Sequence, residues 1–184
     1  MLRIYVNGDE FFDESTETFI TVKSQHIVLE HSLLSISKWE AKWKKAFLDS
    51  TLEKNKKTEE EMMDYIRCMT VTPNVNPLLY KCLSNENIQA INNYINDPMT
   101  ATTFGNQQTG SGKQVITSEL IYYWMIAYNI PSEYEKWHIN RLLTLIRICT
   151  IKMNTKSKKM SSSEIRNQNA ALNAARRAKY HTSG

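Results

Sequence analysis

The sequence predicts a mainly α fold with a small N-terminal antiparallel β-sheet (α+β), in which a helical bundle body carries a basic C-terminal helical arm. Three observations support this prediction. Apolar and polar residues alternate over the first thirty positions, apolar residues recur at helical spacing from Ser35 onward, and positive charge gathers in residues 151–184. A period of two is typical of strands and a period near 3.6 of helices. We therefore expect a globular body over residues 1–153 and a basic linker with a terminal helix over 154–184.

The β-sheet is expected within residues 1–30, and the helical part of the body over 31–153. Alternating runs predict strands at Leu2–Val6, at Phe19–Val22 and at Ile27–Leu29. Asn7-Gly8-Asp9 lies between the first two runs and is typical of a turn, so it predicts the first reversal of the chain.

The first helix is predicted from the spacing of four large apolar residues. Ile36, Trp39, Trp43 and Phe47 fall at i, i+3, i+7 and i+11. This spacing places them on one face of a helix that begins near Ser35. The lysines of the segment lie mostly on other faces. The sequence therefore predicts an amphipathic helix with a tryptophan-lined face.

Further helix starts are predicted from residues that cap helices. A Ser or Thr with Glu three residues later satisfies free N–H groups of the first turn. We expect helix starts at such boxes or single caps, namely Thr58 with Glu61, Ser84, Thr117, Ser132 with Glu135, and Ser161 with Glu164. The helix after Thr117 is apolar on almost every side, which predicts the central, most buried element. A short helix is expected over Leu78–Leu83, and a surface loop over 101–114.

The charge of the chain is divided unevenly. Residues 151–184 hold eight Lys or Arg and one acid, a balance of +7, so the other 150 residues sum to −3 because the whole chain is +4. The terminal helix offers only Ile165 and Leu172 as large apolar residues, so we expect it to dock loosely or to order on a partner. A basic arm favours an acidic or anionic partner.

The sequence contains no pattern that predicts an enzyme. The histidines, cysteines and carboxylates lack metal-site spacing, and His138 is interpreted as a hydrogen-bonded structural residue. The segment Gly105–Gln114 departs from the phosphate-loop pattern, so no cofactor is expected. Three well-separated cysteines predict reduced, buried thiols. The uncharged apolar run Leu120–Ser132 is too short for a bilayer, and no secretory signal is legible, so we expect a soluble intracellular protein.

Two interpretations of the aromatic and methionine-rich helices stay open: core packing, or a groove that accepts a partner helix. Arg141 and Arg147 interrupt an apolar helix, where they either reach solvent, pair with acids such as Glu119 or Glu135, or mark an interface. The candidate partner-binding residues are Trp39, Trp43, Trp137, Arg141, Arg147, Lys158, Lys159, Arg166, Arg176, Arg177 and Lys179.

Several blocks together cover most of the chain in order: Leu29–Phe47, Asp64–Thr70, Pro98–Phe104, Glu119–Pro131, Lys136–Ile148 and Lys158–Ala178. In these blocks the chain resembles the tail assembly chaperones of tailed bacteriophages of the siphophage type. The resemblance implies a non-enzymatic protein that binds the long helical tape-measure protein, keeps it soluble and helps to recruit tail-tube subunits. It also implies action in the host cell cytoplasm during virion morphogenesis, with no membrane partner.

Two alternatives to a chaperone are kept. One is a structural virion component, such as a tail or head–tail connector protein, which would be found in the virion. The other is nucleic-acid binding through the arm, and this is disfavoured because the arm has one aromatic residue, Tyr180, and no reading motif. The sequence leaves homo-oligomerisation open.

Overall fold

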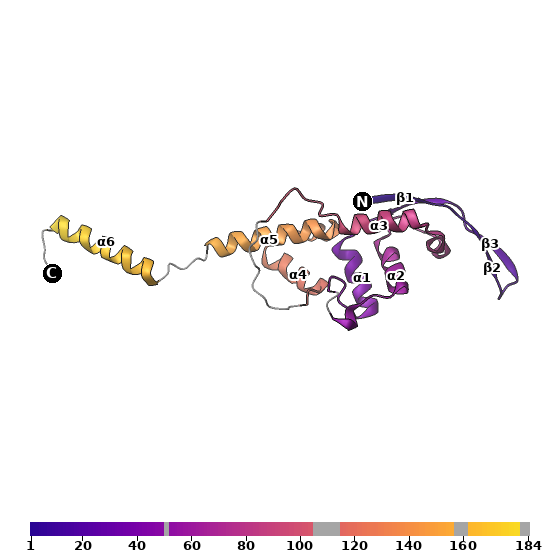
Figure 1. The fold of residues 1–184 in the computed structure, drawn as a ribbon, viewed down its shortest axis with the longest axis horizontal. Helices are drawn as coiled ribbons and strands as arrows, with labels where there is room; N and C mark the ends of the chain where they lie inside the picture. Colours follow the sequence, from indigo (N-terminus) through magenta and orange to yellow (C-terminus); the bar gives the residue numbers. More distant parts are fainter. Residues whose placement is uncertain (50–51, 105–114, 157–161, 181–184) are drawn as a thin grey trace. The chain divides into compact units, whose positions relative to one another are not determined.

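The computed structural model describes residues 1–49, 52–104, 115–156 and 162–180. It has the predicted mainly α fold with antiparallel strands at the N-terminus (Figure 1), so the predicted fold class is confirmed. The chain divides into two compact units, Met1–Arg147 and Ile148–Gly184. The first unit is the body, and the second holds the last part of helix α5 (Ile139–Lys156) and all of helix α6 (Ser162–Tyr180).

Four strands form two nested antiparallel pairs. β1 (Leu2–Val6) pairs with β4 (Gln25–Leu29), and β2 (Glu10–Asp13) pairs with β3 (Thr18–Thr21). Strand β2 was not predicted. The chain reverses at residues 14–17, where Asp13 accepts a 2.9 Å hydrogen bond from the backbone N of Ser15.

The turn predicted at Asn7-Gly8-Asp9 is wrong, because the chain runs on from β1 to β2 there. Gly8 marks a close approach of two chain segments instead. Its N donates to Ser24 Oγ at 2.9 Å, and a Cβ on Gly8 would lie 1.8 Å from the carbonyl oxygen of Val22. Only glycine, which has no Cβ, leaves room for this contact. Gly8 therefore lets two backbone segments pack closely and does not reverse the chain.

Helix α1 (Leu33–Trp43) begins slightly earlier than predicted. Ser32 is its N-cap and forms a capping box with Ser35. The helix ends where Lys44 adopts a left-handed conformation with φ 56°. Phe47, predicted on this helix, therefore lies beyond its end, although its side chain is still buried in the core.

The next elements follow the capping predictions closely. Helix α2 (Glu59–Met69) begins at the predicted box of Thr58 with Glu61, and α3 (Asn85–Asn96) begins at Ser84. Helix α3 ends before Asp97, because the residue ahead of a proline disfavours helical backbone. Two 3₁₀ turns complete this region, η1 (Glu53–Asn55) and η2 (Pro77–Cys82).

Helix α4 (Ser118–Ala127) begins at Thr117 as predicted, but it is not the most buried element. Tyr123 is 62% exposed and Ile126 is 76% exposed. Helix α4 packs against α1, and the buried residues Ser118, Ile121 and Met125 line only one side of it. Its apolar character therefore extends beyond the face that the core needs.

The predicted capping box of Ser132 with Glu135 is wrong. Residues Ser132–Lys136 form a 3₁₀ turn, η3, without a side-chain cap, and α5 (Ile139–Lys156) begins only after His138. The start of α5 is fixed by a distant segment, because Ile139 N donates to His31 O at 2.7 Å and His138 forms a β-bridge with Ser32. Helix α6 (Ser162–Tyr180) follows in the second unit. The predicted cap Ser161, and residues 105–114 of the predicted loop, lie outside the described residues.

The core gathers around the end of β4 and the residues that follow it. Glu30 N donates to Met69 O at 2.8 Å, and Val71 N donates to Val28 O at 2.8 Å, so the end of α2 adds to the free edge of β4. Several side chains here are fully buried, namely Ile27, Leu29, Leu33, Ile36, Trp39, Tyr65, Ile139 and Leu142.

The Glu40 carboxylate ties three segments of the body together. It is buried on α1, where one oxygen accepts the backbone N–H of Phe47 and the other that of Ser118, each at 2.7 Å. The first bond holds the segment after α1, and the second satisfies an N–H at the start of α4. Charge-assisted bonds of this kind are stronger than neutral ones.

We expect Glu40→Gln to lower the free energy of unfolding by about 1.5–3 kcal/mol. The amide keeps one acceptor oxygen and turns an NH₂ group toward a backbone N–H, which then lacks an acceptor. Urea unfolding followed by tryptophan fluorescence measures the change. The control is Glu53→Gln at a side chain that is 85% exposed, for which we expect a change below about 0.5 kcal/mol. Equal stability of the two variants would contradict this role of Glu40.

Candidate partner-binding site

The first predicted partner-binding residue, Trp39, lies in the core. Its side chain is fully buried, and its Nε1 donates to the carbonyl oxygen of Glu61 at 2.7 Å. The prediction that Trp39 contacts a partner is therefore corrected, because its ring joins α1 to α2 inside the body. The predicted tryptophan-lined face of the helix faces the protein's own core.

Trp43 is half-buried and belongs to a polar cluster at the same junction. Its Nε1 donates to Asp64 Oδ2 at 2.8 Å, and Lys42 Nζ contacts Asp64 Oδ1 at 2.7 Å. Burial alone would raise the pKa of Asp64, but the hydrogen bonds from Lys42 and Trp43 outweigh it. The pKa of Asp64 therefore lies below its ordinary value.

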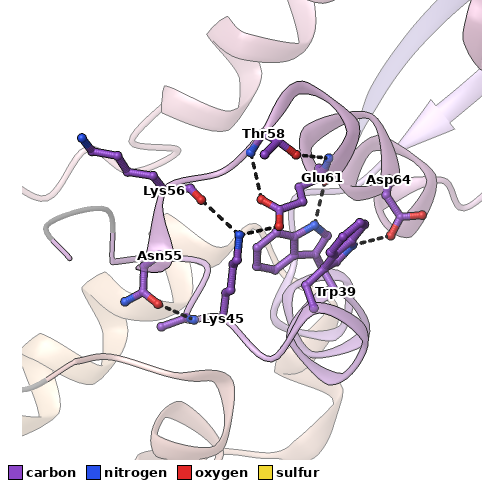
Figure 2. Close-up of polar contacts among 9 residues, drawn as sticks. Trp39, Lys45, Asn55, Lys56, Thr58, Glu61 and Asp64 are labelled. Atoms are coloured by element: carbon purple, nitrogen blue, oxygen red, sulfur yellow. Dashed lines mark hydrogen bonds and ion pairs between the residues drawn. The ribbon is translucent and has the colours of Figure 1, made fainter. Parts of the chain in front are cut away.

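A second carboxylate, that of Glu61, holds the same two helices (Figure 2). It accepts hydrogen bonds from Lys45 Nζ and, at 2.8 Å, from the backbone N of Thr58. The bond from Lys45 and then that from Thr58 lower the pKa of Glu61. The junction of α1 and α2 is thus closed by two carboxylates that are stabilised in their charged form.

An open apolar groove of about 420 Å³ lies on the other side of α2, between that helix and α3. Its polar lining comes from residues 57–59, Asn85 and Asn92. Its walls are large apolar side chains, three from α2 and three from α3: Met62, Met63, Ile66, Ile88, Ile91 and Ile95. Unbranched methionine side chains adapt to different partner surfaces. The groove therefore offers an adaptable apolar surface between two helices.

Lys57 lines this groove, but its charge is turned toward the core. Its Nζ lies 4.7 Å from the ring centroid of the buried Phe47. Burial lowers the pKa of Lys57, against the opposing effect of Asp49 and other carboxylates. The charged end of Lys57 thus lies against the core and not in the groove.

The arginines and the remaining tryptophan of the prediction form stacks at the body surface. The rings of Trp137 and Tyr134 are stacked with centroids 4.0 Å apart, and the Arg141 guanidinium lies 4.0 Å from the Trp137 ring centroid. Arg147 lies 4.0 Å from the ring centroid of Phe104. The apolar part of each arginine therefore covers an aromatic ring, and the charged end remains near the surface.

The predicted basic residues of the arm are described only in part. Arg166, Arg176 and Arg177 are exposed on α6. Lys158, Lys159 and the side chain of Lys179 lie outside the described residues.

Two histidines and two cysteines of the body are held in packed surroundings. His31 contacts Tyr65 OH and His138, and burial followed by the charge of His138 lowers the pKa of His31 to about 3. His138 Nε2 donates to the carbonyl oxygen of Tyr94 at 2.9 Å, which agrees with a structural histidine. Burial raises the pKa of the Cys68 and Cys82 thiols, and so lowers their reactivity.

The three cysteines form no disulfide bond. Cys68, Cys82 and Cys149 are free thiols, as predicted, although they are partly and not fully buried. Within the described residues, no group of three or more His, Cys, Asp or Glu side chains is placed to hold a metal ion. No helix in the described part of the chain has both the length and the apolar character needed to cross a membrane.

Neither a protein-family model, nor a curated protein sequence, nor a solved structure matches this chain. The groove between α2 and α3 was not identified from the sequence as a site. A signal was present in the two stripes Met62–Ile66 and Ile88–Ile95, whose spacing predicted apolar helix faces.

The two carboxylates at the α1–α2 junction predict a specific acid sensitivity. The pKa of each is lowered in the folded state, so each stabilises the fold above the ordinary carboxyl pKa, and this contribution is lost as pH falls through the folded pKa. We expect the double variant Glu61→Gln/Asp64→Asn to be less stable at pH 7. Its proton uptake on unfolding below about pH 5 should be smaller by up to about two protons.

Urea unfolding at a series of pH values between 7 and 3 measures this proton uptake. The control is Glu53→Gln/Glu133→Gln, which removes two carboxylates from exposed positions. The wild-type pH dependence should persist in the control. A double junction variant with the wild-type slope would show that other carboxylates govern acid unfolding.

Proposed function

We propose that the protein is a non-enzymatic tail assembly chaperone of a tailed bacteriophage that binds amphipathic helices of the tape-measure protein. The support comes from two sources. The sequence blocks resemble that family, and the α2–α3 groove offers an apolar surface of the kind that accepts a partner helix. The groove is the observation that carries the binding mode.

The groove suits a helix because its two walls are themselves helical. Met62 and Ile66 lie one turn apart on α2, and Ile88, Ile91 and Ile95 follow at i, i+3 and i+7 on α3. A partner helix with apolar residues at i, i+3 or i+4 and i+7 would bury them between these rows. Two turns of such a helix would then be removed from water, which is how a chaperone keeps an amphipathic protein soluble.

In this proposal the protein acts in the host cytoplasm and assists addition of tail-tube subunits before it leaves the tail. A structural virion component is the alternative. Mass spectrometry of purified virions separates the two functions, because a structural component is present in stoichiometric amounts and a chaperone that leaves the tail is not. Stoichiometric presence in the virion would refute the chaperone proposal.

The groove itself is tested by co-expression with the tape-measure protein of the same phage. We expect the wild type to keep that protein soluble and to co-purify with it. Met63→Ser/Ile88→Ser removes two half-buried apolar side chains from the groove. It should weaken binding of the tape-measure protein at least about tenfold, since burial of one large apolar side chain contributes roughly 1.5–3 kcal/mol. Pull-down with quantified band ratios gives the measurement.

The matched control is Tyr123→Ser/Ile126→Ser on α4, which removes two exposed apolar side chains outside the groove. Thermal unfolding of both variants checks that each is folded. Binding lost equally in the control would place the site elsewhere, and absence of any complex with the wild type at low salt would refute the proposed function.

A further inference from the structure

The β2–β3 hairpin carries an exposed aromatic pair. Phe12 and Phe19 are partners in the strand register, their ring centroids lie 5.2 Å apart, and they are 55% and 69% exposed. The opposite face is used by the body, because Phe11 packs against the core. Figure 1 shows the hairpin continuing beyond β1 away from the helices of the body. The aromatic pair is therefore a sheet face without a partner among the described residues.

Negative charge is concentrated in the hairpin that carries this aromatic pair. Residues 9–21 contain five carboxylates and no Lys or Arg: Asp9, Glu10, Asp13, Glu14 and Glu17. None of the five forms an ion pair with a side chain that the structure describes. Asp13 is engaged by the turn, through Ser15 and Thr16. Asp9 and Glu10 also accept hydrogen bonds within the hairpin, from Glu10 N and Thr21 Oγ1. The excess of negative charge along the hairpin favours a basic partner with an apolar side chain and repels phosphate.

The chain itself carries a segment with the opposite chemistry. Residues 151–184 have a balance of +7, from eight Lys or Arg and one Glu. On α6, Leu172 is exposed, Arg176 follows one turn later on the same face, and Arg177 is exposed beside it. An apolar side chain among cations is the complement of an aromatic pair among carboxylates.

We propose that the outer face of the β2–β3 hairpin binds the basic C-terminal segment of a second copy of this chain. Arginine guanidinium groups pair with carboxylates and stack on aromatic rings, and the hairpin offers both. The contact joins two different surfaces, so it is heterologous and lets copies associate head to tail. It uses neither wall of the α2–α3 groove, and it stands whether or not the tape-measure protein is the partner there.

Sedimentation equilibrium of the full chain tests the proposal. At low salt we expect a mass above the 21.4 kDa monomer that rises with concentration. In about 1 M salt, where charges are screened beyond roughly 3 Å, the mass should return to that of the monomer. Phe12→Ser/Phe19→Ser should weaken association roughly tenfold with an unchanged melting temperature, because both rings are exposed.

Charge reversal identifies the two surfaces. Glu14→Lys/Glu17→Lys on the hairpin and Arg176→Glu/Arg177→Glu on α6 should each be monomeric alone, and a mixture of the two variants should associate again. The control Glu53→Lys/Glu133→Lys makes the same two Glu→Lys changes as the hairpin variant, at other exposed sites, and should leave association intact. A wild-type chain that stays monomeric at low salt, association that salt does not weaken, or a mixture that fails to associate would each overturn the proposal.

Discussion

The body depends on the backbone of residues 28–32, where the end of β4 leads into α1. This segment pairs with β1 on one edge and with the end of α2 on the other, and His31 O accepts the first N–H of α5. The Glu30 side chain adds α3 through a 2.6 Å hydrogen bond from Tyr94 OH. Four elements that are distant in sequence thus meet on five residues. Because buried backbone groups need partners, each of these elements has one position that satisfies the segment.

Buried carboxylates extend this arrangement through the helices. Glu30, Glu40, Glu61 and Asp64 each accept hydrogen bonds that link separate segments, and no described buried side-chain polar atom lacks a partner. Such bonds need defined geometry, so they specify a single packing of the helices. Apolar side chains on α2 and α3 are then not all required to hold the body together. Some of them remain half-exposed in the groove, which is where a binding function can be carried without loss of the fold.

The fold class and most helix starts could be predicted from the sequence, whereas contacts between distant segments could not. Thr58, Ser84 and Thr117 cap helices as predicted, because capping depends on residues within one turn. The predictions at Gly8 and Ser132 were wrong because distant residues determine the structure there. Gly8 lies close to the backbone of Val22, and the helix expected from Ser132 begins only at Ile139, whose N–H bonds to His31 O. The burial of Trp39 was missed for a similar reason. Periodicity identifies the apolar face of a helix, but it does not say whether the protein's own core or a partner covers that face. The groove follows from how α2 and α3 are placed, which neither helix encodes alone.

The way α5 begins bears on the order in which the protein folds as it is synthesised. A helix with its own cap is defined by residues within one turn, whereas the first bond of α5 joins residues more than a hundred positions apart, Ile139 and His31. The N-terminal strands and α1 therefore leave the ribosome long before the segment that completes their packing. During that interval Leu33 has been synthesised and Leu142 has not, so side chains that are fully buried in the complete body lack part of their packing. Nascent chains at this stage are the form of the protein most exposed to aggregation, because the apolar faces that the complete body buries are still in contact with water.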